Sequence, residues 1–201
     1  MEMPKVPKGL IAIGIIVIVA LLLFSSIRGA YNKMVQLDEA VEGQWAQVEN
    51  VYQRRADLIP NLVSTVKGYA SHERETLEAV IEARSKATSV TIDPQNITPE
   101  ALVQFQQAQD GLSSALSRLM VVVERYPDLK ANQNFLDLQT QLEGTENRIA
   151  NERRKYAEVV RDYNTNIRQF PRNIYASIFG FDRKTQFEAT EGAQTAPVIE
   201  F

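Results

Sequence analysis

The fold is decided by a stretch that reads YNKMVQLDEAVEGQWAQVENVYQRRADLI from residue 31 to residue 59. Its apolar residues recur mostly three, four or seven positions apart, among them Val41, Trp45 and Val48. Glutamate and glutamine occupy many of the positions between them. Because an α-helix turns once every 3.6 residues, this spacing gathers the apolar side chains on one face. The stretch therefore predicts an amphipathic helix that packs against other helices.

Directly before this stretch, residues Leu10–Ile27 read LIAIGIIVIVALLLFSSI and contain no charged side chain. As a helix they would span roughly 27 Å, which is close to the hydrocarbon thickness of a bilayer. A cleaved signal peptide is the alternative, but cleavage before Tyr31 would put Arg28 where a small residue is required. We therefore expect residues 1–30 to be an uncleaved anchor that contacts the lipid bilayer through Leu10–Ile27.

The charges that flank the anchor decide its orientation only weakly. Lys5, Lys8 and the terminal amine lie on one side, and Arg28 and Lys33 lie on the other. The side richer in lysine and arginine usually faces the cytoplasm. Only the amine breaks the tie, so we expect a cytoplasmic N-terminus and a bundle outside the cytoplasm, while the opposite orientation stays open.

After the first stretch, Pro60 interrupts the helical pattern. Proline has no amide hydrogen and clashes with the preceding turn of a helix. The sequence therefore predicts a kink or a break near Ile59–Asn61, after which helical spacing resumes at Leu62.

Two more helices are expected further along the chain. Residues 88–99 read TSVTIDPQNITP and predict a loop, which ends where Thr98-Pro99 would cap and start the next helix. That helix is expected to stop at Tyr126-Pro127, and a last one to run from near Leu129 to just before Pro171.

The predicted fold class is all-α. We expect a transmembrane helix followed by a long antiparallel bundle of about four helices over residues 31–169. Gly43, Gly111 and Gly144 fall inside the predicted helices, where each costs about 1 kcal/mol relative to alanine. Close approach of another helix, within the bundle or from a second subunit, would offset that cost.

The chain after the bundle is expected to form two parts, a closing segment at 170–187 and an extended or disordered tail at 188–201. The closing segment either packs on the end of the bundle or presents an apolar patch to a membrane or a neighbouring subunit. The tail ends in APVIEF, which a peptide-binding groove could capture. The candidate contact residues of these two parts are Phe170, Ile174, Tyr175, Ile178, Phe179 and Phe181 in the closing segment, and Val198 and Phe201 in the tail.

A second candidate contact region precedes the predicted break. It comprises Arg54, Arg55, Asp57, Pro60 and Asn61. Asp57 could pair with Arg54, and Asn61 could bond backbone groups that Pro60 leaves free. The region is either a rigid kink that turns the first helix into the second or a corner that docks a partner.

The composition excludes several kinds of site. The chain of 201 residues has no cysteine and one histidine, so disulfides, thiol nucleophiles and clustered metal ligands are not expected. His72-Glu73 begins a zinc motif, but Thr76 stands where the second histidine would be required. The net charge of −3 argues against nucleic-acid binding. We expect no cofactor, no metal and no enzymatic activity.

Several long runs resemble the LemA family. They are Tyr31-Asn32, Trp45-Ala46-Gln47-Val48, RRADLIPNLVSTVKGYASHERETLEAVIEAR at 54–84, LKANQNFLDLQTQLEGTENRIANERRKYAEVVRDYNTNIRQFP at 129–171, Gly180-Phe181, and the final Pro-Val-Ile-Glu-Phe. The resemblance covers essentially the whole chain. It implies a single-pass protein of the bacterial inner membrane with a long helical bundle and without an established activity.

Two functional hypotheses follow. In the first, the chain is a membrane-anchored scaffold that forms homo-oligomers and organises or remodels the envelope membrane. In the second, it is an adaptor that binds a membrane protease or another envelope protein through residues 54–61 or through the tail.

Overall fold

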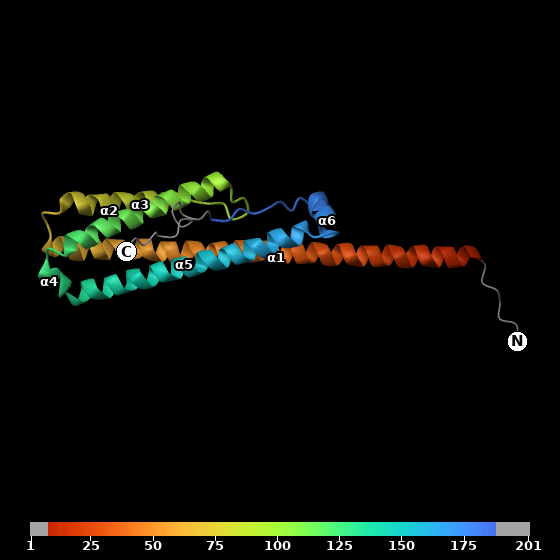
Figure 1. Cartoon of the computed structure of the whole chain (residues 1–201), viewed down its shortest axis with the longest axis horizontal. Coiled ribbons are helices and arrows are strands. Elements are labelled where there is room, and N and C mark those ends of the chain that lie inside the picture. The colour runs from red at the N-terminus through yellow and green to blue at the C-terminus, as the bar shows by residue number, and fades with distance from the viewer. Residues whose placement is uncertain (1–7, 188–201) are drawn as a thin grey trace, which may run out of the picture. The chain divides into compact units, whose positions relative to one another are not determined.

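A computed structural model describes residues 8–187, and every regular element in that range is a helix. The order of the elements is shown in Figure 1. They are α1 (Lys8–Tyr69), α2 (Arg74–Ser89), α3 (Pro99–Val123), α4 (Pro127–Lys130), α5 (Gln133–Arg168) and α6 (Arg172–Phe179). The all-α prediction, with a long apolar N-terminal helix and a helical bundle, is confirmed.

The chain divides into two compact units. Unit 1 comprises Met1–Ala40 and Arg161–Arg183, and unit 2 comprises Val41–Val160 and Lys184–Phe201. Helices α1 and α5 each contribute one part to each unit.

Unit 2 is a bundle built from the later part of α1, from α2 and α3, and from the earlier part of α5. Helices α2 and α3 lie side by side and run in opposite directions (Figure 1). Leucine, isoleucine and valine from all four helices fill one interior, because each helix turns its apolar face inward. The buried members include Ile59, Leu62, Val66, Val80, Leu112, Leu119 and, from α5, Phe135, Leu138 and Leu142, and Leu129 of the short helix α4 joins them.

An aromatic cluster continues the interior of unit 2. Trp45 is fully buried, and its ring meets Phe105 and Tyr156 edge to face at centroid distances of 5.5 and 5.4 Å. Phe187 stacks on Trp45 at 5.9 Å, and the Tyr156 hydroxyl donates to the Thr185 carbonyl at 3.1 Å. Residues 184–187 are therefore held against the bundle by ring packing and a hydrogen bond.

The loop before α3 lies where the sequence predicts it. The Thr98 hydroxyl accepts from the Ala101 amide at 3.2 Å, and Pro99 opens the helix. The start of the last long helix differs from the prediction, because Leu129 belongs to the separate short helix α4. Helix α5 begins at Gln133, after Asn132, whose side-chain oxygen accepts from the Phe135 amide at 3.1 Å.

The predicted break at Ile59–Asn61 is wrong. Helix α1 is 62 residues long and continues through Pro60 to Tyr69. The chain turns towards α2 only at residues 70–73. The helix tolerates Pro60 because the Ala56 carbonyl, which loses its usual amide partner, accepts a hydrogen bond from Arg84 of α2 instead.

Unit 1 combines the first part of α1 with the end of α5 and with α6. Ala30 is the first buried residue of α1, and Met34 is fully enclosed one turn later. The Tyr163 hydroxyl donates to the Asp182 carbonyl at 2.9 Å. Gly180 ends α6 with a positive φ of 75°, a conformation that glycine adopts without strain.

The helix glycines do not mark close helix contacts within the structure. A Cβ atom added at Gly43, Gly111 or Gly144 would meet nothing within 4 Å. The expectation of close approach inside the bundle is therefore wrong, while contact with a second copy stays a prediction.

Candidate functional site

The N-terminal part of α1 has the length and composition of a membrane span. Its most apolar window has a mean hydropathy of 3.1, and none of that window is buried. Leu22 and Phe24 are 65% and 66% exposed, although both are large apolar side chains. A surface of this kind is stable when hydrocarbon covers it.

The region around Pro60 is stabilised by an arginine from the next helix. Pro60 lacks the amide that would normally donate to the Ala56 carbonyl four residues earlier. The Nε atom of Arg84, on α2, donates to this carbonyl at 2.7 Å. Arg84 thus supplies the hydrogen bond that proline removes, and it joins α1 to α2 at this point.

A second arginine, Arg55, joins three helices from inside the bundle. It is 1% exposed. Its Nη1 atom donates to Glu146 at 2.7 Å and to the Ser113 hydroxyl at 3.0 Å, and its Nη2 atom donates to the Gln109 side chain. Gln109 in turn donates to the Ala87 carbonyl at 3.1 Å. This network pairs the buried charge through both Nη atoms, while the buried Nε atom has no hydrogen bond among the described residues, and it fixes the register of α1 against α3 and α5.

The other members of the predicted 54–61 region lie on the surface. Arg54, Asp57, Pro60 and Asn61 are exposed. Asp57 accepts from Gln53 at 2.7 Å. The region is a straight part of α1, so it does not turn the first helix into the second. A contact between its exposed residues and a partner stays a prediction.

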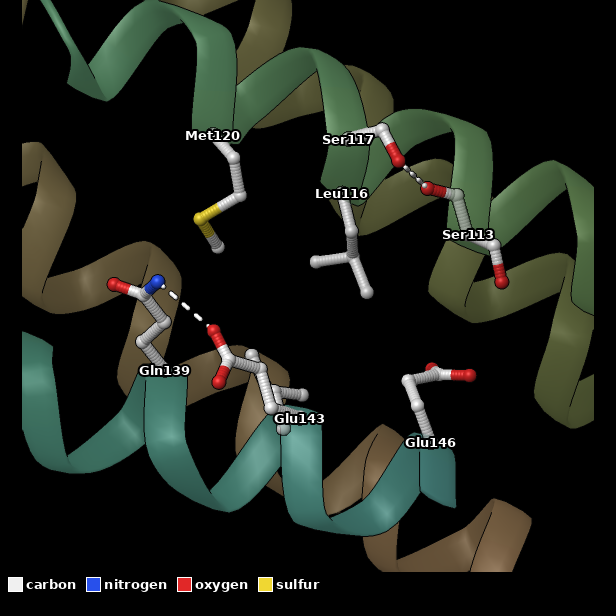
Figure 2. A pocket seen from close by; sticks show the side chains of 8 residues that line it. Ser113, Leu116, Ser117, Met120, Gln139, Glu143 and Glu146 are labelled. Atoms are coloured by element: carbon white, nitrogen blue, oxygen red, sulfur yellow. Dashed lines mark hydrogen bonds between the residues drawn. The ribbon is translucent and has the colours of Figure 1, made fainter. Parts of the chain in front are cut away.

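A groove runs between α3 and α5 in unit 2 (Figure 2). Leu116, Met120 and Leu142 provide its apolar surface, and its volume is about 390 Å³. Figure 2 shows side chains of α3 facing Gln139, Glu143 and Glu146 of α5 across it. Gln139 donates to Glu143 at 3.0 Å. An apolar floor with a polar rim is typical of surfaces that accept a helix.

The predicted closing segment contains α6 and presents much of its apolar surface. Phe170 is 82% exposed and Ile178 is 69% exposed. Ile174 and Phe179 are also exposed, Tyr175 is half-buried, and only Ala176 of α6 is buried. Phe179 and the half-buried Phe181 contact the Tyr31 ring at centroid distances of 5.1 and 5.7 Å. Val198 and Phe201 lie outside the described residues.

Burial and hydrogen bonding shift the pKa of several titratable groups in the described chain. Burial raises the pKa of the Tyr156 hydroxyl. Burial also raises the pKa of Tyr163, and the carboxylates of Asp38 and Asp182 add to this effect. Hydrogen bonds from Lys155 and Gln44 hold the pKa of Glu152 below its usual range. Within residues 8–187 there is no group of three or more side chains suited to a metal ion.

Sequence reasoning missed the roles of Arg84 and Gln109. Arg84 donates to a backbone atom on another helix, a contact that spacing along α2 does not reveal. A signal for Arg55 did exist, because it lies three residues after Tyr52 and four before Ile59 on the apolar face of α1. An arginine on that face is expected to point into the bundle.

Comparison with known proteins identifies a matching family and several similar proteins. The model of the LemA family matches residues 44–201. The chain is 28% identical over 188 residues to Magnetosome protein MamQ 2 of Paramagnetospirillum magneticum, covering 84% of this chain and 68% of that protein. It is 26% identical to Magnetosome protein MamQ of Magnetospirillum gryphiswaldense, covering 94% and 75% of the two chains. Protein LemA of Metamycoplasma hominis is 24% identical, with 81% and 71% covered.

The family model spans well over half of the sequence and includes the Arg55 network, the groove and α6. The relatives match most of the chain as well. The chain therefore belongs to the LemA family.

Proposed function

We propose that this protein is a membrane-anchored scaffold that self-associates through its helical bundle and organises the inner membrane of a bacterium. It acts by binding and shape, without a catalytic step. The apolar, unburied part of α1 supports the anchor. The similarity to proteins named magnetosome proteins favours a role in building a cellular structure.

The observation that carries this proposal is the groove between α3 and α5. The groove-lining residues of each helix extend over about two turns, which is roughly 10 Å. That length accommodates two turns of a further helix, and the floor of Leu116, Met120 and Leu142 would bury its apolar side chains. We assign the groove to a helix of a second copy.

Charge supports a second copy as the occupant. Glu143 gives the rim of the groove a negative charge, while the charge of Glu146 is paired with Arg55. Arg118 and Arg148 are exposed, and among residues 8–187 they have no ion-pair partner. Arginines of one copy can therefore meet the acidic rim of another. Anchoring in one bilayer raises the local concentration of the copies and so favours this contact.

Photo-crosslinking from the groove tests the proposal. The chain has no cysteine, so Ser117→Cys labelled with a benzophenone maleimide carries a single reactive group. Ser85→Cys is a matched control, because Ser85 is an exposed serine on α2 that lines none of the described cavities. In vesicles of the full-length protein, we expect several-fold more crosslinked dimer from position 117 than from position 85. Equal yields from the two positions, or no dimer from either, contradict the proposed contact.

We further propose that unit 2 lies outside the cytoplasm, as the flanking charges weakly favour. Ser85→Cys then reacts with a membrane-impermeant maleimide in intact spheroplasts. Labelling that requires lysis of the spheroplasts would instead place unit 2 in the cytoplasm. Any oligomer of the protein would then form on the cytoplasmic side of the membrane.

A further inference from the structure

Helix α6 carries an apolar stripe that nothing in the described chain covers. Ile174 and Ile178 lie one turn apart and share a face, and Phe170 lies just outside the helix, in the turn that precedes α6. Their exposed fractions are 48%, 69% and 82%. Ala176, on the opposite face of the helix, is 4% exposed. The helix thus packs on the rest of unit 1 through Ala176 and Phe179 and presents Ile174 and Ile178 outward.

The depth of α6 follows from a contact within unit 1. Tyr31 lies four residues after Ile27, the end of the apolar span, and so about 6 Å beyond it along the helix axis. The Tyr31 ring meets Phe179 and Phe181 edge to face. The end of α6 therefore lies at the level of Tyr31, within the roughly 5–8 Å headgroup layer that borders the hydrocarbon core.

The charges around α6 fit the same environment. Residues 168–183 contain three arginines, Arg168, Arg172 and Arg183, and a single acidic residue, Asp182. The chain after residue 30 is acidic as a whole, with a net charge of about −5. This segment is therefore locally basic, as expected for a helix that meets anionic lipid headgroups.

We propose that α6 is an interfacial helix that lies in the headgroup layer of the bilayer spanned by α1, with Phe170, Ile174 and Ile178 inserted at the boundary with the acyl chains. Tyr31 joins the two membrane-contacting elements and sets their relative depth. The protein then binds the membrane through two elements far apart in the sequence. This inference rests on the membrane span of the proposed function and does not depend on self-association.

Depth-dependent fluorescence quenching tests the proposal on the full-length protein. Ile178→Cys and Asn173→Cys each place one environment-sensitive nitrobenzoxadiazole probe at an exposed position of α6. The proteins are reconstituted at low protein-to-lipid ratio into vesicles of phosphatidylethanolamine and phosphatidylglycerol. Lipids that carry a nitroxide near the top of the acyl chain should quench the probe at position 178 several-fold more than the probe at position 173, and its emission should be blue-shifted.

A probe at Val17→Cys, in the span, separates this proposal from the proposed function. Quenching at position 17 together with equal, water-like emission at positions 178 and 173 would overturn the placement of α6 and leave the anchor intact. Shielding at position 178 that disappears as the protein is diluted in lipid would also overturn it, because a second copy would then be the cover. An absence of quenching at position 17 would contradict the membrane span itself.

Discussion

At the scale of single residues, the hydrogen bond from Arg84 to the Ala56 carbonyl explains how α1 continues through Pro60. This account predicts that the two residues are energetically coupled. Arg84→Met should lower the free energy of unfolding by about 1–3 kcal/mol, because it leaves a partly buried carbonyl without a donor. In a Pro60→Ala background the same change should cost clearly less, since the alanine amide can donate to Ala56.

Urea unfolding of the four proteins, followed by circular dichroism, gives this double-mutant cycle. A coupling energy near zero would mean that Arg84 stabilises the bundle independently of Pro60. The account of the proline would then be wrong.

The buried tyrosines predict how stability depends on pH. Burial raises the pKa of Tyr156 and of Tyr52, so the folded protein holds these protons more tightly than the unfolded chain does. The stabilisation is fully present below the unfolded pKa of about 10 and is lost as pH rises through the folded value. The free energy of unfolding should therefore fall steeply above about pH 10, and Tyr156→Phe should make that fall shallower. An identical alkaline slope in the variant and the parent protein would argue against this cause.

At the scale of elements, local sequence signals predict helix ends well, but they do not predict hydrogen bonds that come from a different helix. Thr98-Pro99 starts α3 as expected, because a cap acts within one turn. The sequence predicts a break at Pro60. That prediction is wrong because the Ala56 carbonyl accepts a hydrogen bond from another helix, which the local sequence does not reveal. The groove between α3 and α5 likewise requires the packing of two helices, so residue spacing along either helix alone does not reveal it.

The open surface at Gly144 gives a prediction at the same scale. Gly144 lies inside α5, and an added Cβ would meet nothing within 4 Å. Gly144→Ala should raise the free energy of unfolding by about 1 kcal/mol, because alanine loses less conformational entropy in a helix. Urea unfolding of the full-length protein in detergent measures this change. A loss of stability would instead indicate that a second copy packs closely on α5 at this position.

At the scale of the whole molecule, the protein combines an apolar N-terminal helix long enough to span a membrane, a helical bundle with a buried polar network, and surfaces that are suited to binding. The Arg55 network uses polar groups to hold three helices in register. Apolar side chains are exposed on the N-terminal part of α1 and on α6, while the groove offers the partly buried Met120 beside the largely buried Leu116 and Leu142. This division between a fixed interior and open surfaces is consistent with a protein that acts by assembly.

The division of the chain into anchor, bundle, closing segment and tail stays a prediction. The apolar span and the helical bundle could be predicted because hydropathy and helical periodicity report them directly. Which candidate contact residues point outward could be predicted only in part, since Arg55 lies inside the bundle while Phe170 and Ile178 are exposed. Contacts with other molecules leave no comparable periodic signal in one sequence.

The central claim is that the membrane-anchored protein self-associates, and the mass of the complex tests it most directly. The full-length protein, extracted from membranes with its surrounding lipid, should give by native mass spectrometry a defined multiple of the 22.7 kDa chain. A charge introduced in the groove by Ser117→Glu, at an exposed position, should shift that distribution towards the monomer. A single monomer mass for the parent protein, at every concentration and lipid composition, would contradict the account.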